Sequence, residues 1–267
     1  MILGVADPDD PRIAAYRDIR ERDLVGRQGL FVAEGRVVLA MLLASTRFAA
    51  RSVLIAAHRV AALADLIAQV PDDVPVYAAD QRVLDAIAGF PLHRGILAIG
   101  ERREPLSADA LLASLPERAT VVALSGIANH DNMGGIFRNA AAFGADAVVM
   151  DGDCCDPLYR KAIRVSVGAV LSVPFAVASV GEDLVGLLQA QGFDVLALGL
   201  TGERTLAEVV PGPRIAALFG AEGPGLPAAM LARANGVRIP MAGGFDSLNV
   251  ATTSGIVLHH LMNSDRR

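Results

Sequence analysis

The feature that most constrains the fold is an alternation of short apolar runs and helical segments from Thr120 onward. Strands that alternate with helices predict a parallel sheet covered by helices on both faces. The composition fits, because 53% of the residues are hydrophobic and strands of a parallel sheet are apolar on both faces. The strand candidates are Val121–Leu124, Ala147–Met150, Pro174–Val177, Asp194–Leu198, Ile215–Phe219 and Val237–Ile239, with helices beginning near Asn132, Pro157, Glu182 and Pro227 and a final helix over Leu248–Leu261.

The first hundred residues indicate a second, smaller α/β domain. Helical patterns cover Arg36–Leu43, Val60–Gln69 and Gln81–Ala88, and short buried strands are expected at Ser52–Ala56, Val74–Tyr77 and Gly95–Ile99. Residues 100–118 break this pattern with charge and Pro105, and Ser107 is a candidate helix cap. The sequence therefore predicts domains at 1–106 and 119–267, joined by a linker at 107–118.

The cysteines and the apolar runs indicate where in the cell the protein is expected. Cys154 and Cys155 are neighbours, which rarely form a disulfide, so we expect a reducing cytoplasm. Two adjacent thiols without a nearby Cys or His pair make a poor zinc site, so we expect no metal. No signal peptide and no apolar run long enough to span a membrane are visible, so no membrane partner is expected.

The charge pattern leaves the partner open. A net charge of −5 counts mildly against a nucleic-acid binder, although local patches matter more than totals. The segment from Arg12 to Arg36 carries six arginines against four acids, and Arg160, Lys161 and Arg164 form another basic group. Each group is also compatible with an ordinary solvated face.

Three segments rich in Gly and Asn follow apolar strands in the second half of the chain. The first, Asn129–Arg138 (NHDNMGGIFR), follows the run VVALSG and opens a helix. Asn132 is a plausible N-cap of that helix, and Arg138 follows nearly two turns later, so we expect the two to project close to the same side. This segment alone is also compatible with a capped helix that carries a solvated arginine.

The second segment is Gly220–Pro227 (GAEGPGLP), in which glycines expose the backbone and allow a flat ligand to approach closely. Pro227 fits the first turn of a helix, and Glu222 is compatible with a simple turn residue. The third segment has Gly243-Gly244 followed by Ser247–Ala251 (SLNVA), where Ser247 is a candidate cap that places Asn249 in the first helical turn.

All three segments lie at the carboxyl ends of the expected strands, where ligands of such sheets bind. In combination and order they resemble the three motifs of the SpoU/TrmH branch of the SPOUT methyltransferases. The resemblance covers about residues 119–264 and includes the run RVSVGA at 164–169. In the amino-terminal part, FVAEGRVVLAMLL and HRGILAIG are similar to the substrate-binding domain that many members carry.

The resemblance implies a trefoil-knotted, parallel-sheet α/β domain, an L30e-like amino-terminal domain that binds RNA, and a homodimer whose two subunits shape the active site. It implies S-adenosylmethionine as the cofactor. By this likeness Gly220, Ile239 and Leu248 hold the adenosine, mostly through backbone groups. Met241, Glu222 and the loop Leu198-Gly199 complete the same pocket.

The implied reaction moves a methyl group from a sulfonium to a ribose 2'-hydroxyl of RNA. An unactivated hydroxyl attacks poorly, so the enzyme must align it and help to remove its proton. Arg138, matched to the family's motif arginine, is the candidate, and because arginine rarely deprotonates we expect it to clamp a neighbouring phosphate. Asn132 is expected to orient the ribose or Arg138, and Glu222 to position Asn132 or to balance local positive charge. Ser247 and Asn249 are expected to fix the loops around the methyl group.

Several alternatives stay open at this point. A non-catalytic RNA-binding protein would keep the fold but damage the pocket or lose the arginine. A base methyltransferase of the same superfamily is disfavoured by the pairing of Asn132 with Arg138. A nucleotide-binding dehydrogenase is disfavoured because neither domain has G-x-G-x-x-G after its first strand. The domain layout favours ribosomal over transfer RNA by analogy alone.

Overall fold

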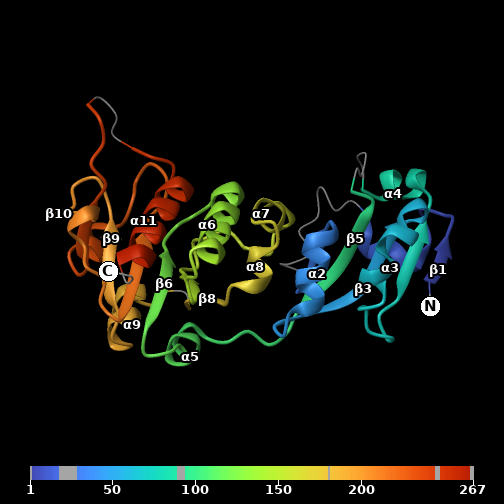
Figure 1. The fold of residues 1–267 in the computed structure, drawn as a ribbon, viewed down its shortest axis with the longest axis horizontal. Coiled ribbons are helices and arrows are strands. Elements are labelled where there is room, and N and C mark those ends of the chain that lie inside the picture. Colours follow the sequence, from blue (N-terminus) through green and yellow to red (C-terminus); the bar gives the residue numbers. More distant parts are fainter. Residues whose placement is uncertain (1, 18–28, 89–93, 180, 244–246, 265–267) are drawn as a thin grey trace. The chain divides into compact units, whose positions relative to one another are not determined.

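The computed structural model describes residues 2–17, 29–88, 94–179, 181–243 and 247–264. The chain divides into two compact units (Figure 1). Unit 1 consists of Met1–Pro105 and Leu158–Ser172, and unit 2 of Leu106–Pro157 and Val173–Arg267. In the described part of the chain, no helix is both long enough and apolar enough to cross a membrane.

Unit 1 is built on a five-stranded mixed sheet with the order β1-β4-β3-β5-β2. β4 pairs in parallel with β1 and β3, whereas β5 is antiparallel to β2 and β3. The three strands expected from sequence correspond to β3, β4 and β5, and the structure adds β1 and β2. The strand bounds are β1 Ile2–Val5, β2 Leu30–Glu34, β3 Phe48–Ala56, β4 Val76–Ala79 and β5 Ile96–Arg102.

The helices of unit 1 include the expected α4 and, within one residue, α2. The helical pattern at 60–69 forms only two short pieces, η3 and α3, because the backbone of Leu63, with φ −115 and ψ 11, departs from helical geometry. Apolar side chains such as Tyr16, Leu54 and Leu84 are buried in the core of this unit. The helix bounds are η1 Pro11–Tyr16, α2 Arg36–Ala44, η2 Ala57–Arg59, η3 Ala61–Leu63, α3 Ala64–Ile67, α4 Gln81–Ala88, α7 Arg160–Val165 and α8 Ala169–Ser172.

The helices α7 and α8 belong to unit 1 although their sequence lies inside the second expected domain. α7 packs against β2, and Arg160 forms an ion pair of 2.6 Å with Glu34, in which both side chains are largely buried. Arg47 donates a hydrogen bond of 3.1 Å to the carbonyl of Leu171 in α8. Gly168 has φ +86, and a Cβ there would lie 2.7 Å from the sulfur of Met41, so glycine permits this close packing. The expected division into consecutive domains therefore does not describe residues 158–172.

Unit 2 contains a seven-stranded sheet of parallel strands in the order β10-β12-β9-β11-β6-β7-β8. The expectation of a parallel-sheet α/β fold is confirmed, and all six expected strands are present, with the short β10 in addition. The strand bounds are β6 Ala119–Leu124, β7 Ala147–Met150, β8 Phe175–Val177, β9 Asp194–Leu198, β10 Arg204–Thr205, β11 Arg214–Phe219 and β12 Asn235–Arg238.

The expected linker contains a helix, α5, and Ser107 is its N-cap as the sequence predicted. The Ser107 hydroxyl accepts a hydrogen bond of 3.2 Å from the amide of Ala110, and Leu111 and Leu112 are buried in the core of unit 2. The remaining helix bounds in unit 2 are α5 Ala108–Ala113, α6 His130–Ala142, α9 Leu184–Ala190, η4 Leu206–Glu208, α10 Ala228–Leu231 and α11 Val250–Ser264.

The helices α6 and α11 lie side by side and run in the same direction. A Cβ at Gly135 would lie 2.7 Å from the side chain of Ala251, so the helices approach closely where both begin. One turn further, Asn139 Nδ2 donates to the carbonyl of Ala251 at 2.6 Å and to the hydroxyl of Ser254 at 3.0 Å. This packing fixes the start of α6 against the start of α11.

Candidate active site

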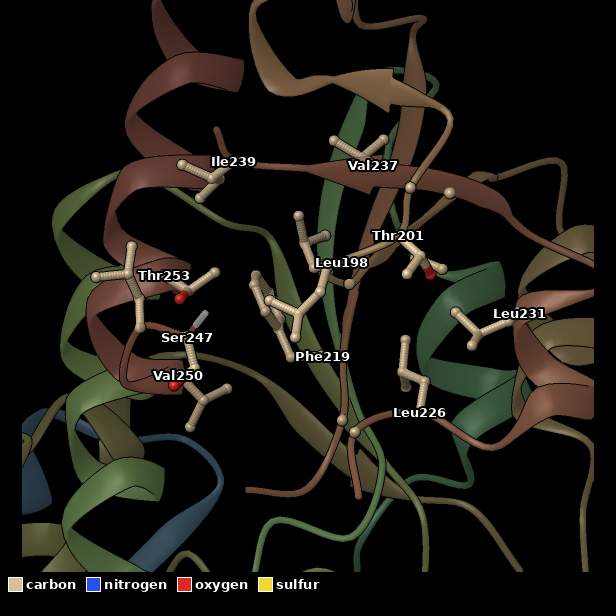
Figure 2. Close-up of a pocket in the computed structure, with 18 of the residues that line it drawn as sticks. Leu198, Thr201, Phe219, Leu226, Leu231, Val237, Ile239, Ser247, Val250 and Thr253 are labelled. Atoms are coloured by element: carbon tan, nitrogen blue, oxygen red, sulfur yellow. The ribbon is translucent and has the colours of Figure 1, made fainter. Parts of the chain in front are cut away.

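A cavity of about 900 Å³ lies at the carboxyl ends of β9, β11 and β12, as expected for a parallel sheet. Loops from three distant parts of the chain line it. In Figure 2, Phe219 and Leu198 lie in the middle of the view, with Ile239 and Thr253 to the left and Leu226 and Leu231 to the right. The expected residues that line this cavity are Leu198, Gly199, Gly220, Glu222, Ile239, Met241, Ser247, Leu248 and Asn249.

Gly220 sets the shape of the second loop. A Cβ at this position would lie 2.5 Å from the carbonyl carbon of Gly225 and from the amide nitrogen of Leu226. The loop returns over Gly220 because the amide of Gly225 donates to the carbonyl of Ala221 at 3.0 Å, and Gly223 and Gly225 adopt φ +87 and +70. Any side chain at Gly220 would push this loop away from the sheet.

Asn249 joins all three motif segments. Its Oδ1 accepts hydrogen bonds from the amides of Ala251 and Thr252 at 2.9 and 3.2 Å, which is the pattern of an N-cap on α11. Its Nδ2 donates to Asn132 Oδ1 at 2.8 Å and to Glu222 Oε1 at 3.2 Å. The expectation that Ser247 caps this helix is therefore wrong, because the helix begins after Asn249 and the asparagine takes that role.

Asn132 is also not the cap of its own helix. The N-cap of α6 is Asn129, whose side chain accepts a hydrogen bond of 2.8 Å from the amide of Asp131. Asn132 is the third helical residue and only 5% exposed. Because the cap fixes the amide of Asn249, Asn132 must turn Oδ1 toward it, and Asn132 Nδ2 is left buried with no hydrogen-bond partner in the structure described.

Arg138 lies outside this cluster. Its side chain is exposed, whereas Asn132 is buried, and Arg138 is not among the residues that line the cavity. The expectation that the two project close to the same side is wrong, because six residues of an α-helix turn the direction by about 600°, which leaves roughly 120° between them. The structure thus brings together Asn132, Glu222 and Asn249, and it does not add Arg138 within the unit.

The charged side chains that line the cavity in the described part of the chain are all acidic. Glu203 and Glu222 are its ionisable lining residues in the described part of the chain, and no arginine or lysine lines it there. The remaining walls are apolar side chains and glycine backbone. Such a cavity favours a flat ligand that carries positive charge.

The sequence analysis missed several residues that line the cavity. Residues 200–203, which follow Leu198-Gly199 after β9, also line the cavity, as do Leu231 and Thr253. A Cβ at Gly202 would lie 2.5 Å from the carbonyl carbon of Val237, so this loop packs directly on β12. The rule that loops after parallel strands form the site would have found 200–203, whereas Leu231 and Thr253 carry no sequence signal.

The two cysteines lie beside the loop that precedes α6. The amide of Ile127 donates to the sulfur of Cys154 at 3.3 Å, and both cysteines are free thiols. Burial raises the pKa of Cys154 to about 12 and that of Cys155 to about 11. Both are therefore protonated at neutral pH, and their surroundings indicate a role in packing.

A sequence profile of the SpoU rRNA Methylase family matches residues 119–259, which is more than half of the chain. The chain belongs to the SpoU rRNA methylase family. The expected membership in this family of RNA methyltransferases is confirmed, and the matched region includes all three segments that meet at Asn249.

Relatives of this SpoU-family methylase are also named as RNA methyltransferases. The chain is 41% identical to an uncharacterized tRNA/rRNA methyltransferase of Mycobacterium tuberculosis, over 98% of this chain and 92% of the relative. It is 29% identical to the 23S rRNA (guanosine-2'-O-)-methyltransferase of Escherichia coli, over 69% and 77%. Its structure is similar to that of an AdoMet-bound rRNA methyltransferase from Sinorhizobium meliloti, with a TM-score of 0.82, 25% identity, and coverage of 99% and 98%.

Proposed function

We propose that this protein transfers a methyl group from S-adenosylmethionine to a ribose 2'-hydroxyl of structured ribosomal RNA. The observation that carries the proposal is the contact of Asn249 with both Asn132 and Glu222 at the cavity. It brings the polar residues of three distant segments to one place beside a pocket for the methyl donor. The relative in Escherichia coli, named for 2'-O-methylation of guanosine in 23S rRNA, supports ribose and ribosomal RNA as the targets.

The cavity fits S-adenosylmethionine in size and in chemistry. Its 900 Å³ lies within the range of sites for ligands of this size, and Gly220 and its glycine-rich loop line it with backbone groups. Gly220, Ile239 and Leu248 would hold the adenosine, and Leu198, Gly199 and Met241 would complete the walls. The carboxylates of Glu203 and Glu222 suit a ligand with a cationic sulfonium and ammonium group. When bound, the cofactor supplies an electrophilic methyl group.

The chain's own residues must prepare the hydroxyl. Arginine stays protonated, so Arg138 acts by holding the phosphate next to the ribose and by stabilising the oxygen as its proton passes to water. Asn249 orients the carboxylate of Glu222, and Asn132 fixes Asn249 from the buried side. Ser247, exposed at the rim of the cavity, helps to position the ribose beside the methyl group.

Arg138 reaches the cavity of a second copy of the chain. It is exposed on α6 and absent from the cavity of its own unit, and the neighbouring helix α11 exposes Ile256 at 41%. A twofold dimer through α6 and α11 would place Arg138 of one subunit at the pocket of the other. In the same proposal the chain forms the trefoil knot of its family near its carboxyl-terminal end, and residues 1–106 form the RNA-binding domain.

The first test of the function is methyl transfer to RNA. Purified protein with radiolabelled S-adenosylmethionine should label the ribose of one nucleotide in ribosomal RNA from a deletion strain, as located by ribose-methylation mapping. Arg138→Ala should reduce transfer about 100- to 1,000-fold and leave cofactor binding unchanged. A label on a base would refute the reaction class, and unchanged turnover of the variant would refute the role of Arg138.

A mixing experiment tests whether Arg138 acts on the partner's pocket. Arg138→Ala and Gly220→Val are each expected to be inactive, and random mixed dimers should recover about a quarter of the wild-type activity, because half of the dimers hold one complete site. If Arg138 acts within its own subunit, no mixture regains activity.

A further inference from the structure

The carboxyl end of β2 gathers basic side chains from separate parts of unit 1. Glu34 ends this strand, and its buried carboxylate pairs with Arg160 of α7 at 2.6 Å. Its backbone carbonyl accepts a hydrogen bond of 3.4 Å from Arg94. The next residue, Gly35, has φ +101, and a Cβ there would lie 3.2 Å from Cδ of Arg94. One strand end therefore positions two arginines that are 66 residues apart in the sequence.

Two more arginines adjoin this point. A Cβ at Gly95, next to Arg94 in sequence, would lie 2.8 Å from Cδ of Arg59, so the Arg59 side chain lies directly on the glycine backbone. Arg36 follows Gly35 as the first residue of α2, and it pairs with Asp65 at 2.5 Å while its side chain stays 57% exposed. The glycines at 35 and 95 leave space that the arginine side chains fill.

The helix α7 extends the basic character on its exposed side. Arg160 faces Glu34, whereas Lys161 and Arg164 are exposed and three residues apart, so they lie on neighbouring positions of the helix. No carboxylate pairs with Arg94 or Arg164 within the described ranges of the chain. These residues thus concentrate positive charge in a protein of net charge −5.

We propose that these basic residues form one phosphate-binding surface for the RNA substrate, here called the Gly35 surface. It consists of Arg36, Arg59, Arg94, Lys161 and Arg164, and the largely buried pair of Arg160 with Glu34 holds α7 in place. The inference rests on the proposed function and extends it, because α7 comes from the sequence that matches the methylase profile. Part of the methylase sequence therefore contacts RNA from within unit 1.

Several features favour an RNA backbone as the partner. Guanidinium groups bind phosphate oxygens in a two-pronged geometry, and four of the five residues are arginine. The cations come from α2, η2, α7 and the turn before β5, so they cover a surface and do not converge on one small ligand. Contacts of this type position a nucleic acid without reading its sequence. Of the other basic group predicted from sequence, Arg20, Arg22 and Arg27 lie outside the described residues.

The test measures binding of a fluorescein-labelled RNA hairpin to the full-length protein by fluorescence anisotropy at several salt concentrations. Arg94→Glu and Arg164→Glu change exposed residues from the two parts of the surface. Each should weaken binding about 5- to 10-fold near 0.1 M salt and reduce the slope of log K against log[salt] by about 1.

Arg51→Glu is the matched control. Arg51 is an exposed arginine of β3 that pairs with Glu101, at the opposite end of the same sheet. It should change RNA binding less than about twofold, since it contacts no phosphate. S-adenosylmethionine affinity should be the same in all three variants, which shows that unit 2 is intact.

The outcomes separate this surface from the catalytic proposal. Unchanged RNA affinity in Arg94→Glu, or in Arg164→Glu alone, overturns the shared surface even if methyl transfer proceeds. Displacement of the hairpin by polyglutamate, which would indicate an acidic protein partner, also overturns it. If Arg94→Glu and Arg164→Glu weaken binding of the hairpin as expected, and the wild-type protein never methylates ribosomal RNA, the surface is supported and the catalytic proposal fails.

Discussion

The candidate site of unit 2 and the Gly35 surface of unit 1 use glycine for different purposes. In unit 2, Gly220 lets one backbone segment pack on another, and the surrounding polar side chains are fixed by hydrogen bonds to Asn249. In unit 1, Gly35 and Gly95 lie beneath long arginine side chains that remain exposed. The first arrangement fixes geometry, and the second concentrates charge.

This difference indicates how the two tasks of an RNA methylase are divided. Methyl transfer requires reacting atoms held in line within a fraction of an ångström, which favours a cavity with rigid walls. Binding of a polyanion depends on the number of charges more than on their exact positions. We therefore expect variants of the cavity to affect the cofactor and variants of the Gly35 surface to affect RNA.

The largest expected effect is that of Gly220→Ala on the geometry of the cavity in unit 2. Its Cβ would overlap the backbone at Gly225 and Leu226, so the loop must move and S-adenosylmethionine affinity should fall about 100-fold or more. Calorimetric titration measures this, while RNA anisotropy should stay at the wild-type value. Gly212→Ala, where a Cβ meets open space, is the control and should bind normally. A variant that keeps full cofactor affinity would show that the loop adapts.

The sequence predicted β6, β7, β9 and β11 of unit 2 well, because each is an apolar run that is mostly buried. It was less informative where short-range signals are ambiguous. Ser247 and Asn249 are both good N-cap residues, and only the contacts with Asn132 and Glu222 distinguish them. The packing of α7 on β2 was also unpredictable, because periodicity shows that a segment is buried but not which partner buries it.

The ion pair of Glu34 with Arg160 should have the next largest effect, since it anchors α7 in unit 1. Removing either partner leaves a largely buried charge alone, so Glu34→Ala should destabilise the unit by about 3–5 kcal/mol. Denaturant unfolding measures the loss, and hydrogen exchange should show it first in residues 160–172. The exposed pair of Arg51 with Glu101 is the control, and Glu101→Ala should cost less than about 1 kcal/mol. Equal effects of both variants would mean that α7 does not depend on this pair.

The smallest expected effect is that of substitutions at Asn249, which caps α11 and also links Asn132 to Glu222. Asn249→Ala loses both roles and should destabilise unit 2 by about 2 kcal/mol, of which about 1 comes from the cap and about 1 from the unsatisfied oxygen of Asn132. Asn249→Ser keeps a capping oxygen, so it should recover about half of that stability. Thermal unfolding followed by circular dichroism measures both.

Activity should separate from stability in the same pair of variants. Neither alanine nor serine at position 249 can donate to Asn132 and Glu222 together, so both variants should lose methyl transfer to a similar extent although the serine variant is more stable. Transfer that recovers in proportion to stability would instead assign Asn249 to folding alone. The geometry of the cavity would then depend on its backbone and not on this side-chain bridge.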